Sequence, residues 1–265
     1  MLELNKIYCG DCLEIIKEIT DKSIDLIVTS PPYDNLRIYN GFYFDFERIA
    51  RELYRVIRRG GVIVWVVNDA VINGSETGTS FKQALYFKGT GLNLHDTMIY
   101  QKTSSSLPDK KRYSQVFEYM FIFSKGTPKT FNPIIDKPNR QAGSSNPTKK
   151  RKVSGEMIKT QKYYTIPLVG KRTNIWIYEV GYNKGTKDKI AFEHPATFPE
   201  KLAEDHILSW SNEKDIVLDP LCGSGTTCKM AKKNNRNFIG IEINPDYVDI
   251  ANKRLANTYR QLELI

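Results

Sequence analysis

A stiff turn with one aromatic ring follows a short apolar run near the start of the chain. Residues 24–28 predict a buried strand, and this strand stops at Thr29-Ser30-Pro31-Pro32-Tyr33. Two consecutive prolines fix φ at about −65° and remove two N–H donors, which leaves carbonyl oxygens, a hydroxyl and a ring to meet a ligand. Such a surface suits a planar group whose amine is held by acceptors. A plain end to the strand is the alternative, because proline commonly punctuates chains.

A glycine-rich turn, Asp219-Pro220-Leu221-Cys222-Gly223-Ser224-Gly225-Thr226-Thr227, lies between a predicted strand and a predicted helix. Its glycines allow a ligand to approach the backbone closely at a helix N-terminus. The turn has neither the third glycine of the dinucleotide fingerprint nor the Gly-Lys-Ser/Thr of a P-loop. The carboxylate of Asp219 at the strand end therefore indicates a bound ammonium rather than a pyrophosphate.

A second carboxylate lies at the end of the next predicted strand. Glu242 follows Gly225 by 17 residues, which is the placement from which a carboxylate accepts hydrogen bonds from ribose hydroxyls. A solvated charge at the strand end is the alternative, and the apolar neighbours of Glu242 disfavour it.

The rest of the chain alternates apolar strands with amphipathic helices. The predicted strands are 6–8, 24–28, 62–67, 97–100, 117–123, 216–218 and 238–243, and the predicted helices begin at Asp11 or span 46–59, 198–210, 226–233 and 246–257. Gly60-Gly61 is expected to end the second of these helices. This alternation predicts an α/β fold with a doubly wound, mostly parallel sheet of seven strands, whose carboxyl ends form the ligand crevice.

The positive charge of the chain is concentrated in one segment. The 265 residues include 39 Lys and Arg against 30 Asp and Glu, a net charge of +9. Residues 127–193 hold 14 basic and 5 acidic side chains (14 − 5 = +9), so the remainder, with 25 of each, is neutral. Within this segment, residues 137–155 predict a flexible loop around Lys149-Lys150-Arg151-Lys152. We favour a lobe that faces a polyanion; a merely solvated loop and a nuclear targeting signal are the alternatives.

Several classes of protein are disfavoured. No apolar run reaches the ~18–20 residues of a membrane span, and the first residues lack the pattern of a secretory signal. The four cysteines Cys9, Cys12, Cys222 and Cys228 are too few for a disulfide scaffold. Their spacing disfavours a zinc site, so no metal is expected. A reduced, cytoplasmic protein without a membrane partner is the expectation.

Together, Thr-Ser-Pro-Pro-Tyr, Asp-Pro-Leu-Cys-Gly-Ser-Gly-Thr-Thr and Gly-Ile-Glu resemble the S-adenosylmethionine-dependent DNA amino-methyltransferases. Those enzymes methylate the exocyclic amine of cytosine (N4) or adenine (N6). The catalytic motif precedes the cofactor motif by 190 residues (219 − 29), an order that resembles the permuted β class of restriction-modification systems. The resemblance implies a catalytic half at 1–126, a target-recognition insert at 127–193 and a cofactor-binding half at 194–265.

The resemblance also implies residues for S-adenosylmethionine. Asp219 would hold the methionine ammonium, Glu242 the ribose, and Asp11 with Cys12 the adenine ring, although Asp11 also fits the cap of its own helix. The other expected cofactor contacts are Pro220, Cys222, Gly223, Ser224, Gly225 and Thr226. The segment 194–199, His-Pro-Ala-Thr-Phe-Pro, matches the family segment near the methionine end.

The implied catalytic residues are Ser30, Pro31, Pro32 and Tyr33. The Ser30 hydroxyl and the Pro31 carbonyl would accept the two N–H bonds of the amine, and Tyr33 would stack on a base that is flipped out of the duplex. Positioning would supply most of the rate, because the sulfonium methyl is already activated. Serine before Pro-Pro is more typical of cytosine-N4 enzymes and aspartate of adenine-N6 enzymes, so cytosine N4 is favoured and adenine N6 is the alternative.

Double-stranded DNA is the expected partner, with Lys149, Lys150, Arg151 and Lys152 contacting phosphates. A separate restriction endonuclease is a candidate partner, and a monomer and a homodimer are both open. Methylation of RNA or of a protein amine is disfavoured by the basic insert and by the absence of a recognisable RNA module. A DNA-binding protein with an inactive methyltransferase core is a further alternative, disfavoured by the intact motifs.

Overall fold

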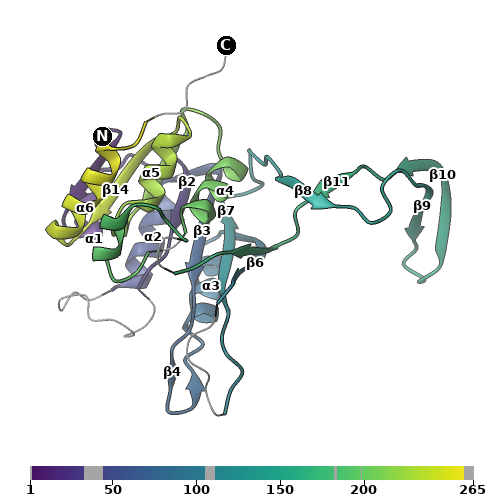
Figure 1. The fold of residues 1–265 in the computed structure, drawn as a ribbon, viewed down its shortest axis with the longest axis horizontal. Coiled ribbons are helices and arrows are strands. Elements are labelled where there is room, and N and C mark those ends of the chain that lie inside the picture. The colour runs from purple at the N-terminus through teal and green to yellow at the C-terminus, as the bar shows by residue number, and fades with distance from the viewer. Residues whose placement is uncertain (1, 33–43, 105–110, 182–183, 198, 260–265) are drawn as a thin grey trace. The chain divides into compact units, whose positions relative to one another are not determined.

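The computed structural model describes residues 2–32, 44–104, 111–181, 184–197 and 199–259 (Figure 1). The chain forms two compact units, one from Met1–Asn132 with Asn174–Ile265 and a smaller one from Pro133–Thr173. The predicted insert 127–193 is therefore longer than the smaller unit, because residues 174–193 return to the larger one.

The larger unit is built on one sheet of eight strands. In spatial order these are β1 (Lys6–Cys9), β14 (Asn237–Glu242), β13 (Ile216–Asp219), β2 (Ile24–Thr29), β3 (Ile57–Val67), β7 (Phe117–Ser124), β6 (Asn93–Lys102) and β12 (Ile175–Tyr178). Only β7 runs antiparallel to its neighbours. The mostly parallel sheet is confirmed, whereas the count of seven strands was wrong. The eighth strand, β12, buries Trp176 and Tyr178 on one face and exposes Ile175 and Ile177 on the other, and it lies inside the predicted insert.

Helices cover both faces of this sheet (Figure 1). The helices α1 (Cys12–Ile15), α2 (Phe46–Val56) and α3 (Thr79–Gly89) pack with each other and on β14, β3, β6 and β7. The helices α4 (Glu200–Trp210), α5 (Thr226–Lys233) and α6 (Pro245–Ala256) pack together and on β2, β13, β14 and β1. Two short 3-10 helices are η1 (Ile16–Glu18) and η2 (Lys189–Glu193). No helix in the described ranges is long and apolar enough to cross a membrane.

The predicted helix 46–59 was wrong at its C-terminal end. Helix α2 stops at Val56, and β3 begins at Ile57 and runs through Gly60-Gly61. Gly60 has φ +81°, and a Cβ there would lie 2.9 Å from the Cβ of Lys129, so the glycine permits a bend in the strand. Burial of the remaining apolar residues of β3 outweighs the helical spacing of the sequence.

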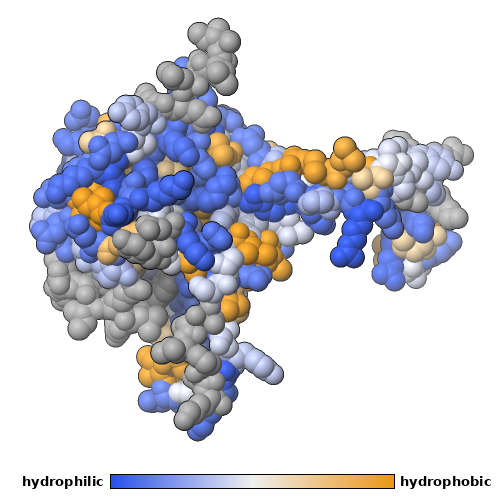
Figure 2. All heavy atoms as spheres, viewed as in Figure 1, coloured by the Kyte–Doolittle hydropathy of each residue, from blue (hydrophilic) through white to orange (hydrophobic). Residues whose placement is uncertain are grey.

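The smaller unit consists of two antiparallel pairs of strands. Strand β8 (Ile135–Pro138) pairs with β11 (Val169–Lys171), and β9 (Ser145–Arg151) pairs with β10 (Met157–Thr165). The expectation of a flexible loop at 137–155 was therefore wrong: β9 carries Lys149 opposite Lys159, and Lys150 opposite Ile158. Figure 2 shows apolar side chains along the β8–β11 pair, where Ile135, Leu168 and Val169 are exposed. A further two-stranded hairpin, β4 (Val71–Ile72) with β5 (Ser75–Glu76), belongs to the larger unit.

A histidine lies in the core between α4 and the sheet. His206 is fully buried, its Nε2 lies 3.1 Å from the Sδ of Met120, and its ring centroid lies 4.6 Å from that of Trp176. Burial lowers the pKa of His206 to about 3, against the opposing effect of Asp205. The imidazole is therefore neutral in the folded protein at pH values where an unfolded chain would protonate it.

We predict that His206 makes the protein sensitive to mild acid. Since the unfolded chain binds a proton below pH ~6.5 and the folded chain does not, the free energy of unfolding should fall by up to about 1.4 kcal/mol per pH unit as the pH drops from 6.5 toward 3. Urea unfolding of His206→Leu should show a shallower pH slope than the wild type. The same substitution at the exposed His95 should keep the wild-type slope; equal slopes for all three proteins would contradict the prediction.

Candidate active site

The strand order reverses between β2 and β13, and the carboxyl ends of these two parallel strands lie side by side. Such a reversal is where open α/β sheets bind ligands. The Thr29 hydroxyl at the end of β2 donates a 2.7 Å hydrogen bond to Oδ1 of Asp219 at the end of β13. This bond brings the Ser30-Pro31 turn beside the glycine-rich turn.

Asp219 is a buried carboxyl group with only 2% of its surface exposed. Its Oδ1 also accepts from the Leu221 N–H at 3.2 Å. Burial raises the pKa of Asp219 to about 6, although these hydrogen bonds act in the opposite direction. In the described part of the chain, the groups with the largest effects on this pKa include no lysine or arginine. The carboxyl group is therefore suited to a cation from a ligand.

The glycine-rich turn depends on two glycines with positive φ. Gly223 has φ +47°, and a Cβ there would lie 2.8 Å from Nε2 of His194. Gly225 has φ +76° and precedes α5; a Cβ there would lie 2.7 Å from the Cβ of Ala251. Side chains at either position would push the turn away from its neighbours.

Other predicted residues of this turn are buried, among them Pro220, Ser224 and Thr226. The Cys222 N–H donates to the carbonyl of Ile241 at 2.9 Å, and its thiol lies in hydrogen-bond contact with that of Cys228. Cys222 is thus held by the protein interior. All four cysteines are free thiols, and no cluster of metal-binding side chains occurs among the described residues.

Glu242 shapes the same turn from β14. Its Oε2 accepts from the Gly223 N–H at 2.8 Å and its Oε1 from the Asn244 N–H at 2.9 Å. Burial raises the pKa of Glu242 above its usual value, against these bonds. A carboxylate has about four lone-pair positions, so capacity remains for ligand hydroxyls.

The residues predicted to contact the adenine ring lie next to Glu242, because β1 pairs with β14. The Gly10 N–H donates to the Glu242 carbonyl at 2.9 Å, and Asp11 caps α1 by accepting from the Leu13 N–H at 2.8 Å. The pKa of the Cys12 thiol is raised to about 12 by burial and then by the negative charges of Asp11 and Glu242. Asp11, Cys12 and Glu242 therefore form one neighbourhood.

The turn predicted to be catalytic is described up to Pro32. Pro31 is buried, and Ser30 and Pro32 are half-buried. The predicted stacking residue Tyr33 lies outside the described residues. Lys149, Lys150, Arg151 and Lys152 all belong to the smaller unit, whereas the residues that converge at the strand ends belong to the larger one.

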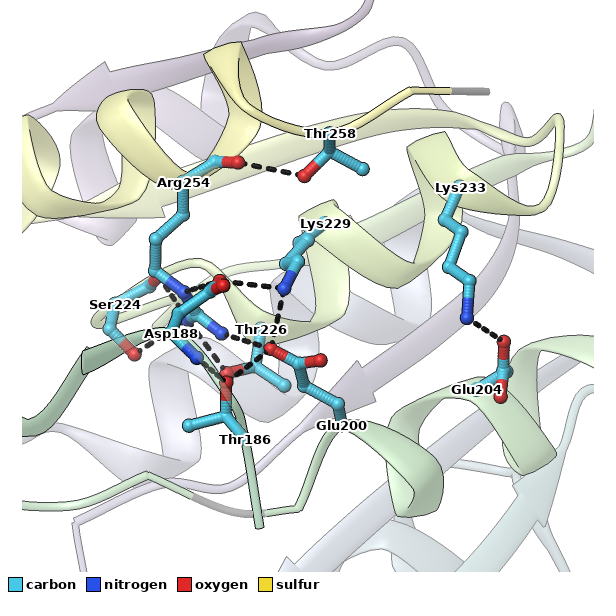
Figure 3. A network of polar contacts seen from close by, with 10 residues as sticks. All are labelled: Thr186, Asp188, Glu200, Glu204, Ser224, Thr226, Lys229, Lys233, Arg254 and Thr258. Atoms are coloured by element: carbon cyan, nitrogen blue, oxygen red, sulfur yellow. Dashed lines mark hydrogen bonds and ion pairs between the residues drawn. The ribbon is translucent and has the colours of Figure 1, made fainter. Parts of the chain in front are cut away.

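Sequence reasoning missed a group of charged side chains behind the glycine-rich turn, namely Asp188, Glu200, Lys229 and Arg254 (Figure 3). It also gave no role to Thr29 or Thr227. Arg254 lies on an amphipathic helix, where an arginine ordinarily indicates a solvent-exposed face. Its burial follows from tertiary contacts that the helical pattern does not show.

Comparison with known proteins identifies the family. The family described as DNA methylase, of the N6/N4 type, matches residues 24–253. The orphan methyltransferase M.BamHII of Bacillus amyloliquefaciens is 60% identical over 243 residues, which cover 91% of this chain and 92% of that protein.

Two solved structures have the same fold. The cytosine-N4-specific PvuII DNA methyltransferase aligns with a TM-score of 0.67 and 22% identity, covering 98% of this chain and 95% of that one. The DNA modification methylase TTHA0409 of Thermus thermophilus, complexed with S-adenosyl-L-methionine, aligns with a TM-score of 0.62 and 24% identity, covering 95% and 94%. The family match spans both halves of the strand-end site, and this chain therefore belongs to the N6/N4 DNA methylase family that its motifs resemble.

Proposed function

We propose that this protein transfers a methyl group from S-adenosylmethionine to the exocyclic amine of a base flipped out of duplex DNA, with cytosine N4 favoured. The observation that carries the proposal is the hydrogen bond between Thr29 and Asp219, which joins the catalytic turn to the cofactor carboxylate. Family membership and a neighbour solved with S-adenosyl-L-methionine support the choice of cofactor.

The residues at the strand ends fit this cofactor. Asp219 is buried, and the described groups with the largest effects on its pKa include no cation, so it holds the methionine ammonium. Glu242 accepts from the ribose hydroxyls while its backbone contacts keep the turn in place. Asp11 and Cys12 bind the adenine side. Bound there, S-adenosylmethionine supplies an activated sulfonium methyl group.

The catalytic turn holds the nucleophile. The lone pair of an aromatic amine is delocalised into the ring, so the amine is a poor nucleophile until it is held and aimed. Ser30 Oγ and the Pro31 carbonyl accept its two N–H bonds, and Tyr33 stacks on the base. The rigid Pro31-Pro32 pair keeps these acceptors in place, and orientation provides most of the acceleration.

Duplex DNA is bound through the smaller unit. Residues 133–173 contain 10 basic and 2 acidic side chains (10 − 2 = +8), so this unit carries nearly all of the net charge of +9. Lys149, Lys150 and Arg151 lie on β9, and Tyr163 and Tyr164 on β10 are exposed. We infer that this part of the 127–193 segment contacts phosphates and recognises the target.

Ser30 in place of an aspartate favours cytosine over adenine, and adenine N6 is the alternative. We also infer a cytoplasmic location, where bacterial DNA is accessible. A separate restriction endonuclease as a partner stays a prediction. A monomer and a homodimer both stay open.

Cofactor binding should depend on the ionisation of Asp219. Above pH ~6 the carboxylate attracts the ammonium, and below it the group is protonated, so affinity for S-adenosylmethionine should fall by about tenfold per pH unit below 6. Asp219→Asn should bind roughly 10–100 times more weakly at pH 8, because a charge-assisted hydrogen bond is lost. Calorimetric titration from pH 5 to 8 measures both effects. Asp249→Asn, at an exposed site on α6, should match the wild type, and a pH-independent wild-type affinity would contradict the assignment.

Binding to DNA should weaken steeply as salt rises. Each phosphate contact contributes a slope of about −0.9 to a plot of log affinity against log salt. Lys149→Ala/Lys150→Ala should therefore reduce the slope by about 1.8 if both contact phosphate. The matched variant Lys6→Ala/Lys17→Ala, in the larger unit, should keep the wild-type slope. A wild-type affinity for DNA that does not change with salt concentration would contradict the proposed interface.

The base should be revealed by methylating genomic DNA and sequencing it with modification-sensitive chemistry. We expect N4-methylcytosine at one recognition sequence; N6-methyladenine would establish the alternative, and methylation of RNA or protein alone would overturn the proposal. Ser30→Ala should lower kcat by roughly a hundredfold, because a group that holds the amine in the transition state is lost. Its affinity for S-adenosylmethionine should equal that of the wild type.

A further inference from the structure

Arg254 is an arginine whose side chain is fully buried on α6. Its Nη1 donates to the Ser224 carbonyl at 2.6 Å, to the Ser224 hydroxyl at 3.0 Å and to the Thr226 hydroxyl at 3.1 Å. These two residues flank Gly225, where the glycine-rich turn enters α5. One nitrogen of Arg254 therefore contacts the turn on both sides of its second glycine (Figure 3).

The other nitrogens of the guanidinium bind two acids. Nε lies 3.1 Å from Oδ2 of Asp188, and Nη2 lies 2.8 Å from Oε1 of Glu200. Asp188 immediately precedes η2, and Glu200 begins α4. The two acids thus flank the segment 189–199, which contains His194.

Lys229 on α5 completes the cluster. Its Nζ lies 2.6 Å from Asp188 Oδ2 and 2.7 Å from Glu200 Oε1, so two cations face two carboxylates. Thr186 adds a 2.6 Å hydrogen bond to Glu200 Oε1. Matched charges and further hydrogen bonds offset the cost of removing such groups from water. In Figure 3 the ammonium group of Lys229 contacts only the two acids, whereas the guanidinium of Arg254 contacts the acids and the turn.

These contacts link two walls of the strand-end site. The His194 ring lies against Gly223, since a Cβ on that glycine would come within 2.8 Å of Nε2. Arg254 holds both ends of the His194 segment and, through the same planar group, the turn that contains Gly223. A guanidinium has a fixed fork of donors, so it sets the spacing of the groups it binds more strictly than an ammonium does.

We propose that Arg254 is a positioning residue for S-adenosylmethionine, which fixes the glycine-rich turn relative to the His194 segment. This inference rests on the proposed function. Arg254 acts through the turn, and neither it nor the two acids need touch the cofactor.

The test compares Arg254→Lys and Arg254→Met with Lys229→Met and Lys233→Met. Arg254→Lys keeps the positive charge beside Asp188 and Glu200 but cannot span the acids and the turn together. We expect its melting temperature to stay near that of the wild type while its dissociation constant for S-adenosylmethionine rises roughly tenfold or more. In steady state, KM for S-adenosylmethionine should rise more than KM for DNA.

The lysine variants separate positioning from general stability. Lys229→Met removes a cation from the same acids and should lower the melting temperature, with a smaller loss of cofactor affinity than Arg254→Met shows. Lys233 lies on α5 like Lys229, pairs with Glu204 of α4 at 2.9 Å and is half-exposed, so Lys233→Met should match the wild type in both measurements.

Calorimetry with S-adenosylmethionine and thermal unfolding give the decisive outcomes. If both Arg254 variants bind the cofactor within twofold of the wild type, or if affinity follows melting temperature equally across the arginine and lysine variants, Arg254 is only structural and the inference fails. A wild-type protein that binds no S-adenosylmethionine would instead overturn the proposed function, and the inference with it.

Discussion

A buried hydrogen bond, from the Thr29 hydroxyl to Asp219, joins the two halves of the site. It lies where the strand order reverses, so the turns that follow β2 and β13 diverge from adjacent strand ends. Thr227 strengthens the junction by donating to the Val28 carbonyl at 3.1 Å. The cost of this arrangement is a carboxyl group removed from water, which is visible in its raised pKa. A cationic ligand would offset that cost. The burial that lowers the stability of the free protein therefore favours binding of such a ligand.

Much of the site could be predicted from the sequence, because residues at the carboxyl ends of parallel strands converge at one edge of the sheet. Ser30, Asp219 and Glu242 each follow a run of apolar residues, and the structure brings all three to that edge. The local sequence pattern predicted an element correctly where burial and periodicity agreed, as in α5, whose bounds matched the prediction.

The misses share a physical cause, since each depends on contacts between distant segments. Helix α2 ends early because Ile57 pairs with Ile24 in the sheet, which no helical spacing reveals. Strand β12 joins the sheet through β6, more than seventy residues earlier in the chain. Arg254 is buried because Asp188, Glu200 and Ser224 surround its guanidinium, and these partners are scattered along the chain. The basic composition led to the prediction of a flexible loop at 145–151, where the residues form a strand.

The position of β13 in the sheet has a consequence for the protein during its synthesis. Strand β2 is complete early, yet β13, which covers one of its edges, lies 190 residues further on. At ribosomal speeds of about 5–20 residues per second, that edge stays unpaired for roughly 10–40 s on the nascent chain. An open apolar strand edge invites pairing with other chains. The permuted order thus places the centre of the sheet among the last parts to close, and no ligand can stabilise the sheet until the distal turn has emerged.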